Sequence, residues 1–136
     1  MNFPVLQGLK VLLVDDDPDT RFLYTFVLTE ESATVSTEAS VESALAAMQA
    51  TSFDLLISDI GLPYIDGFKF LRQVRVLPVA TNAQIPAVAV TGFADEGTQL
   101  QILAAGFQRA LVKPTDIDQF VAIVADLAGQ HQKVAQ

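Results

Sequence analysis

The sequence contains no cysteine and no tryptophan, and it has only one histidine. The absence of cysteine excludes disulfide bonds, thiolate metal sites and thiol nucleophiles, and it is consistent with a reducing compartment. Basic residues are scarce, because 8 lysines and arginines stand against 16 aspartates and glutamates, which gives a formal net charge of −8. This balance argues against nucleic acid or an anionic membrane surface as a direct partner.

Long apolar runs are also absent. No stretch approaches the roughly 20 residues that span a membrane, and the start MNFPVLQGLK lacks the charged and apolar segments of a signal peptide. We therefore expect a cytoplasmic protein without a membrane partner. The 136 residues, 51% of them hydrophobic, suffice for one folded domain. We expect a short lead over 1–8, the domain over 9–129 and a tail over 130–136.

Short apolar runs bounded by polar residues predict five strands, at 11–14, 33–37, 54–57, 87–90 and 110–112. Most of these runs do not alternate with polar residues, which is typical of parallel strands covered on both faces. Helical patterns lie between the runs and after the last one, beginning near Pro18, Ser40, Asp66, Asp95 and Thr115. This alternation predicts an α/β fold with a doubly wound, five-stranded parallel sheet in the order 2-1-3-4-5 and helices on both faces.

Capping residues predict where several helices begin and end. Asp17 is expected to cap the first helix, and Gly106 is expected to end the fourth. Thr115 begins a Thr-x-x-Asp capping box for the last helix, which Gly129 is expected to end. The stretch 77–86 is expected to be a surface loop.

Polar residues gather where the predicted strands end. In an open parallel sheet, ligands bind beyond the carboxyl ends of the strands, at the change in strand order. The residues at those ends are Asp15, Asp16, Asp17, Ser58, Asp59, Thr91, Gly92 and Lys113. Crowded carboxylates must bind either protons or a cation, and a site made of hard oxygen ligands favours Mg²⁺.

A phosphoryl group would fit beside such a cation. Lys113 supplies a positive charge for it, and the Thr91 hydroxyl and the Gly92 amide could donate to its oxygens. The chain lacks cysteine, and its one histidine, His131, lies in the expected tail. The nucleophile must therefore be a carboxylate. Asp59 is the candidate, since an aspartate can attack phosphorus and form an acyl phosphate.

Five fragments resemble the receiver domains of two-component response regulators, which serve signal transduction and phosphorelays. They are 14–18 (VDDDP), 58–63 (SDIGLP), 66–67 (DG), 91–92 (TG) and 112–114 (VKP), within residues 9–128. The resemblance implies a flavodoxin-like fold and a phosphoprotein whose Asp59 accepts a phosphoryl group from a histidine kinase or a histidine phosphotransfer protein. It implies a signalling domain rather than an enzyme, with at most self-phosphotransfer and autodephosphorylation activity.

The resemblance also implies a role for each matching residue. Asp15, Asp16, Asp59 and the backbone carbonyl of Gly61 would hold Mg²⁺, for which Mn²⁺ could substitute, with Asp16 the more direct ligand of the acidic pair. Thr91, Gly92 and Lys113 would bind the phosphoryl group, and the bond between Lys113 and Pro114 would be cis.

Three positions depart from the usual receiver pattern. Position 110 is Ala where many receivers carry an aromatic residue that swings inward on phosphorylation, position 92 is Gly where Ala is common, and position 115 is Thr where an apolar or aromatic residue is common. The missing aromatic residue at position 110 leaves open how phosphorylation is coupled to the face formed by the last helix, strand and helix. The segments 77–86 and 104–114 look more like receivers attached to hybrid sensor histidine kinases.

The predicted first helix carries apolar residues over a wide arc. Leu23 and Val27 are expected to face inward, with Tyr24 and Leu28 beside them. Phe22 and Phe26, four positions apart, fall toward the outer side. They form either the edge of a wide core stripe or an exposed patch for a partner. Because histidine phosphotransfer domains of this family dock beside the first helix, our hypothesis is that both phenylalanines contribute to kinase docking or to a homodimer. Exposure of both below about a tenth would exclude it.

Three other functions compete with this interpretation. A calcium loop starting at Asp15 would need glycine and glutamate where the chain has Thr20 and Phe26. An aspartate-nucleophile, Mg²⁺-dependent phosphatase similar to haloacid dehalogenases would need a further acidic pair and a cap, for which the chain is too short. A pseudo-receiver that only docks a partner is the remaining alternative. For Thr91, a turn formed by its own hydroxyl also stays open.

Overall fold

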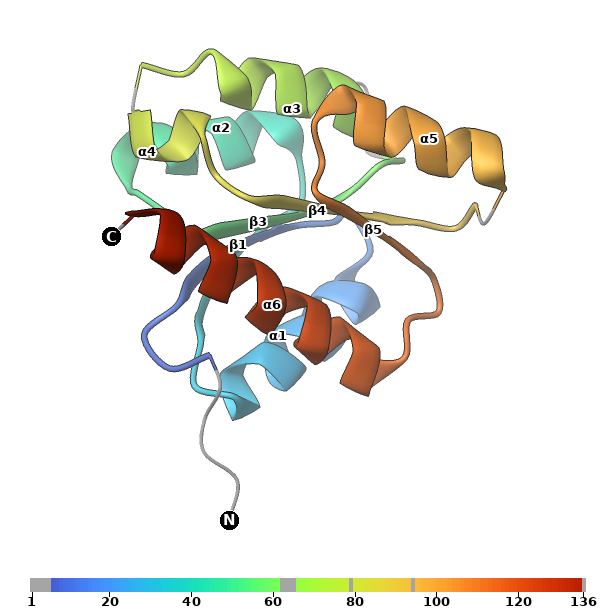
Figure 1. Cartoon of the computed structure of the whole chain (residues 1–136), viewed down its shortest axis with the longest axis horizontal. Helices are drawn as coiled ribbons and strands as arrows, with labels where there is room; N and C mark the ends of the chain where they lie inside the picture. Colours follow the sequence, from blue (N-terminus) through green and yellow to red (C-terminus); the bar gives the residue numbers. More distant parts are fainter. Residues whose placement is uncertain (1–5, 62–65, 79, 94, 136) are drawn as a thin grey trace.

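A computed structural model describes residues 6–61, 66–78, 80–93 and 95–135 (Figure 1). Five parallel strands form one sheet in the order β2-β1-β3-β4-β5, as predicted. The strands are β1 (Lys10–Val14), β2 (Thr34–Glu38), β3 (Leu55–Asp59), β4 (Ala87–Thr91) and β5 (Arg109–Val112). The helices are α1 (Pro18–Glu30), α2 (Val41–Ala50), α3 (Gly67–Arg75), α4 (Ala80–Ala83), α5 (Glu96–Ala105) and α6 (Ile117–Ala135).

Helices cover both faces of the sheet because its central strands are apolar on both sides. Val11 and Leu13 of β1 face one core cluster, and Leu12 and Val14 face the other. Helices α1 and α6 close the first cluster, whereas α2, α3 and α5 close the second (Figure 1). The predicted α/β class with helices on both faces is therefore confirmed. Within the described residues, none of the helices is both long and apolar enough to cross a membrane.

Several helix ends follow the capping residues found in the sequence. The side chains of Asp17, Ser40, Asp66 and Asp95 each accept a hydrogen bond from a backbone amide of the first helical turn. Gly106 follows α5 with φ of 109°, a conformation in which a glycine avoids the strain that a side chain would cause. These signals are local, so the sequence alone shows them.

Two predictions for the last helix were wrong. Helix α6 begins at Ile117, and the Asp116 carboxylate accepts from the Gln119 amide at 3.0 Å, so Asp116 rather than Thr115 caps it. The Thr115 hydroxyl is instead hydrogen-bonded to the Tyr24 hydroxyl of α1. The helix also continues through Gly129 to Ala135, because a glycine inside a helix costs only about 1 kcal/mol.

Two further predictions need correction. The stretch 77–86 contains the short helix α4, held by the buried Asn82 side chain, whose amide donates to the carbonyls of Met48 and Thr51. Leu23 was expected to face inward, but it is 43% exposed. Helix α1 packs instead through Tyr24, Val27 and Leu28, which leaves Leu23 at the side of the buried stripe.

Candidate functional site

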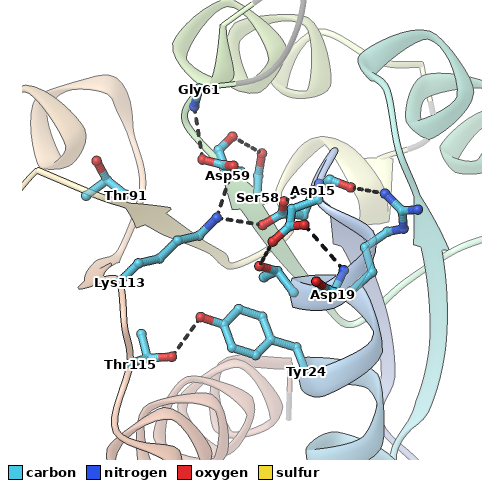
Figure 2. Close-up of polar contacts among 12 residues, drawn as sticks. Asp15, Asp19, Tyr24, Ser58, Asp59, Gly61, Thr91, Lys113 and Thr115 are labelled. Atoms are coloured by element: carbon cyan, nitrogen blue, oxygen red, sulfur yellow. Dashed lines mark hydrogen bonds and ion pairs between the residues drawn. The ribbon is translucent and has the colours of Figure 1, made fainter.

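The carboxyl ends of β1, β3 and β5 bring two carboxylates and one ammonium together. Strands β1 and β3 are neighbours with Val14 opposite Ser58, so Asp15 and Asp59, the next residues, lie side by side. Lys113 follows β5 and extends across the end of β4 (Figure 2). Its Nζ lies 3.0 Å from Oδ2 of Asp15 and 3.2 Å from Oδ2 of Asp59. One ammonium therefore bridges the two carboxylates.

Asp15 is the buried member of the group. Its side chain is 1% exposed, and its Oδ1 accepts from the Asp17 amide at 2.9 Å. Burial raises the pKa of this carboxyl, assisted by the nearby Asp59, and it outweighs the opposing effects of the Asp17 amide and the Lys113 ammonium. The Arg21 guanidinium donates to the Asp15 backbone carbonyl at 2.7 Å, which fixes the turn between β1 and α1.

Lys113 is held in its charged form by its two partners. Burial alone would lower the pKa of its ammonium, but hydrogen bonding and charge attraction from Asp15 and Asp59 outweigh that effect and raise the pKa. The Lys113 amide donates to the Thr91 carbonyl at 2.7 Å, which fastens this segment to β4. The peptide bond between Lys113 and Pro114 is cis, the isomer that the resemblance implied.

Asp59 remains reachable from outside the protein. Its side chain is 13% exposed, and its Oδ1 accepts from the Gly61 amide at 3.0 Å. Gly67 lies against the backbone behind it, where an added Cβ would come within 2.8 Å of the Asp59 carbonyl oxygen. Glycine at position 67 therefore lets α3 begin close to the end of β3.

Three carboxylates could share a metal ion here. Ligand atoms of Asp15, Asp16 and Asp59 all lie within 4.8 Å of one another. Asp16 is exposed, so the group opens to solvent on one side. Three carboxylates with an open side fit a hard divalent cation that keeps some of its waters. Asp17 takes a different role, since its carboxylate accepts from the Thr20 hydroxyl at 2.6 Å and caps α1.

Thr91 and Gly92 lie at the carboxyl end of β4, beside this group. Thr91 is 2% exposed, and its Oγ1 accepts from the Phe93 amide at 3.1 Å. This bond is the turn that the sequence left open as an alternative. Gly92 is exposed, and an added Cβ would meet no atom within 4 Å. The structure thus gathers ligand atoms of Asp15, Asp16 and Asp59 within 4.8 Å of one another and pairs Lys113 with Asp15 and Asp59. Thr91 stands apart from them (Figure 2).

Two contacts near the site were not found from the sequence. One is the bond from Arg21 to the Asp15 carbonyl. The other joins the Tyr24 hydroxyl to Oγ1 of Thr115 at 2.7 Å across 91 positions. Neither contact has a motif, because each depends on how separate elements pack.

Phe22 and Phe26 are exposed, at 75% and 57% of their surfaces. Both values exceed the exposure of about a tenth below which the docking hypothesis would be excluded. Both line a groove of about 500 Å³ between α1 and β2, and Phe26 also borders a groove of about 490 Å³ between α1 and α6. Apolar side chains thus project from α1, whose first turn borders the carboxylate group.

Comparisons with known proteins agree with this geometry. The chain is 37% identical over 119 residues to a Leptolyngbya boryana protein called "uncharacterized 14.6 kDa protein in sodA1 3′ region", covering 88% of this chain and 89% of that protein. It is 32% identical over 117 residues to the transcriptional regulatory protein TcrA of Mycobacterium tuberculosis, covering 86% of this chain. The chain spans 45% of TcrA, less than half the length of that relative.

A solved structure shows the same arrangement of elements. The receiver domain of the sensor histidine kinase PA1611 from Pseudomonas aeruginosa superposes with a TM-score of 0.81 and 25% identity, covering 90% of this chain and 98% of that domain. That structure is described as having a magnesium ion coordinated in its active site cleft. The family model for the response regulator receiver domain matches residues 11–125. The chain therefore belongs to the response regulator receiver domain family.

Proposed function

We propose that this receiver, in the cytoplasm, accepts a phosphoryl group on Asp59 from a phosphohistidine of a histidine kinase or histidine phosphotransfer protein. The difference in exposure between the two bridged carboxylates supports the proposal. Asp15 is 1% exposed and bonded inward, whereas Asp59 is 13% exposed and open to an incoming group. A phosphoryl acceptor must be within reach of its donor, and Asp59 is the more exposed of the two carboxylates.

In the proposed reaction, a carboxylate oxygen of Asp59 attacks phosphorus. The new phosphorus–oxygen bond forms as the phosphorus–nitrogen bond of the phosphohistidine breaks, and the electron pair of that bond stays on the imidazole nitrogen of the donor. The Lys113 ammonium already lies 3.2 Å from Asp59, so a small movement of its side chain would place it on a phosphoryl oxygen. The Thr91 hydroxyl accepts from the Phe93 amide and keeps its own proton, which it would donate to another phosphoryl oxygen.

Receiver domains bind Mg²⁺ at acidic residues, and the three clustered carboxylates here fit such an ion. We propose that Asp15, Asp16, Asp59 and the Gly61 carbonyl hold it, with Mn²⁺ as a substitute. The structure records the amide of Gly61 beside Asp59, so the carbonyl's role is an inference from the family. When bound, the ion would reduce the repulsion between the carboxylates and the incoming phosphoryl group.

The signal would leave the site through local rearrangement. We propose that Lys113 and Thr91 move toward the phosphoryl group and shift their loops. The added negative charge would thereby change the equilibrium between two conformations of these loops. We also propose that Phe22 and Phe26 contact the phosphodonor protein or a second copy of the chain, because both are exposed on α1 next to the site.

The test is phosphorylation with acetyl phosphate, with and without Mg²⁺, in the wild type and in Asp59→Asn. The proposal expects a Mg²⁺-dependent adduct, stable in acid and labile in base, that Asp59→Asn lacks. The absence of an adduct under every condition would favour a pseudo-receiver that only docks a partner. Continuous phosphate release without a lasting adduct would favour a phosphatase.

A further inference from the structure

Tyr24 joins α1 to the segment that carries Lys113. Tyr24 is 4% exposed, and its ring stacks on Phe120 of α6 with centroids 4.6 Å apart. Its hydroxyl lies 2.7 Å from Oγ1 of Thr115, and either group could be the donor. Thr115 follows Lys113 with only Pro114 between them. A partly buried contact between distant elements therefore ends beside the residue that pairs with Asp59 (Figure 2).

The backbone around Lys113 is held from two sides. On one side its amide donates to the Thr91 carbonyl at the end of β4. On the other, Thr115 is fastened to α1 by Tyr24. A pocket of about 310 Å³, lined by α1 together with Lys113, Pro114 and Thr115, lies beside this link. The bond between the Tyr24 and Thr115 hydroxyls is thus the polar contact that ties this side of the segment to α1.

We propose that Tyr24 is a positioning residue for the phosphorylation site. Its hydroxyl acts through Thr115 to fix the segment from which Lys113 reaches Asp59, and it links changes at that site to α1. This inference rests on the proposed phosphorylation of Asp59 and specifies how that site is controlled. The opposite end of β5 offers little for such a link, since position 110 there is a half-buried alanine. A change in Lys113 would thus reach the helix that carries Phe22 and Phe26.

Matched substitutions separate this role from simple packing. Tyr24→Phe keeps the ring on Phe120 but removes the hydroxyl, Thr115→Val removes the other hydroxyl at nearly constant shape, and Thr115→Ser restores one. The initial rate of Mg²⁺-dependent phosphorylation by acetyl phosphate is measured where all variants are folded. Losing one hydrogen bond should slow the reaction about two- to tenfold in Tyr24→Phe and in Thr115→Val. The double variant should be no slower than the slower single variant, and Thr115→Ser should keep the wild-type rate.

Asn82→Ala serves as the control for lost stability. It removes a buried polar clamp at α4 and α2, on the other face of the sheet from Tyr24. A merely structural role for Tyr24 predicts that Asn82→Ala and Tyr24→Phe slow phosphorylation alike, whereas the positioning role predicts that Asn82→Ala keeps the wild-type rate.

Tyrosine fluorescence supplies a readout other than reaction rate. The chain has two tyrosines and no tryptophan, so Tyr64→Phe leaves Tyr24 as the only source of that emission. Adding beryllofluoride and Mg²⁺, as a mimic of the phosphoryl group, should change the Tyr24 emission. The change should be absent in Thr115→Val and in Asp59→Asn.

The outcomes are distinguishable. If the wild type forms the Asp59 adduct but Tyr24→Phe and Thr115→Val react at the wild-type rate and Tyr24 emission stays constant, the positioning role is overturned and the proposed function stands. If the wild type forms neither the adduct nor the beryllofluoride complex, both are overturned.

Discussion

Removing the Lys113 ammonium should destabilise the protein in a manner that depends on pH. Lys113→Met keeps most of the side-chain volume but leaves Asp15 and Asp59 facing each other without the cation that now bridges them at 3.0 and 3.2 Å. Removing one partner of a buried ion pair typically costs about 3–5 kcal/mol. The Lys113 side chain is 27% exposed, so water would screen part of the loss, and we expect a decrease of about 2–3 kcal/mol in the free energy of unfolding at pH 7.5.

The sign of the pH dependence follows from the two pKa shifts. The pKa of Lys113 is raised in the folded state above its ordinary value of 10.5. The resulting stabilisation is fully present below pH 10.5 and is lost as pH rises through the folded-state pKa, so it is fully present at pH 7.5. In the variant the deficit comes from ionised carboxylates. Burial raises the pKa of Asp15 above 3.8 in the folded state, so this carboxyl gains a proton before its unfolded counterpart as pH falls. The deficit should therefore be smaller at pH 4 than at pH 7.5.

Urea unfolding at pH 7.5 and pH 4, without divalent cations, measures both quantities. Lys69→Met, which removes an exposed lysine from α3, is the matched control and should change stability by less than about 0.5 kcal/mol. An equal deficit for Lys113→Met at the two pH values would refute the electrostatic account. So would a deficit at pH 7.5 no larger than that of the control.

Three further predictions follow from the structure. Asn82→Ala leaves three backbone groups without their partner at a fully buried position. Urea unfolding should therefore show a decrease of about 2–4 kcal/mol in the free energy of unfolding. A decrease under about 0.5 kcal/mol would contradict the role of Asn82 in holding α4. Mg²⁺ at ten times its dissociation constant should stabilise the wild type by about 1.4 kcal/mol in thermal unfolding. Asp16→Asn should weaken this stabilisation. Equal stabilisation of the wild type and the variant would show that Asp16 is not a metal ligand. The double variant Phe22→Ser, Phe26→Ser should slow phosphoryl transfer from a phosphohistidine protein but not from acetyl phosphate. Leu103→Ser, which changes an exposed residue of α5, should slow neither transfer. Equal slowing of the transfer from both donors would exclude docking through α1.

Much of the fold follows from local signals in the sequence. The strands are short apolar runs whose two faces are both covered, and the caps at Asp17, Ser40, Asp66 and Asp95 act within one helical turn. The alternation of strands and helices predicts a parallel sheet, and five strands fit the doubly wound order 2-1-3-4-5. The same reasoning placed Asp15, Asp59 and Lys113 at one edge, because parallel strands present their carboxyl ends together.

The features that sequence reasoning missed depend on contacts between distant segments. Helix α4 is held by Asn82, whose partners lie 29 to 34 positions away. Thr115 has a capping residue's chemistry, but its hydroxyl pairs with Tyr24 across 91 positions, and Asp116 caps α6 instead. The Thr91 turn, by contrast, is local, and the sequence left it open because residue type alone does not determine whether the hydroxyl accepts from the Phe93 amide.

The most direct test of the account is to locate the phosphoryl group. After incubation with acetyl phosphate and Mg²⁺, borohydride reduces an aspartyl phosphate to homoserine, which peptide mass spectrometry assigns to a position. The account predicts homoserine at position 59 only, and none when Mg²⁺ is withheld or in Asp59→Asn. Homoserine at another aspartate, or its absence from every peptide of the Mg²⁺-treated wild type, would contradict the claim that Asp59 is the phosphoryl acceptor.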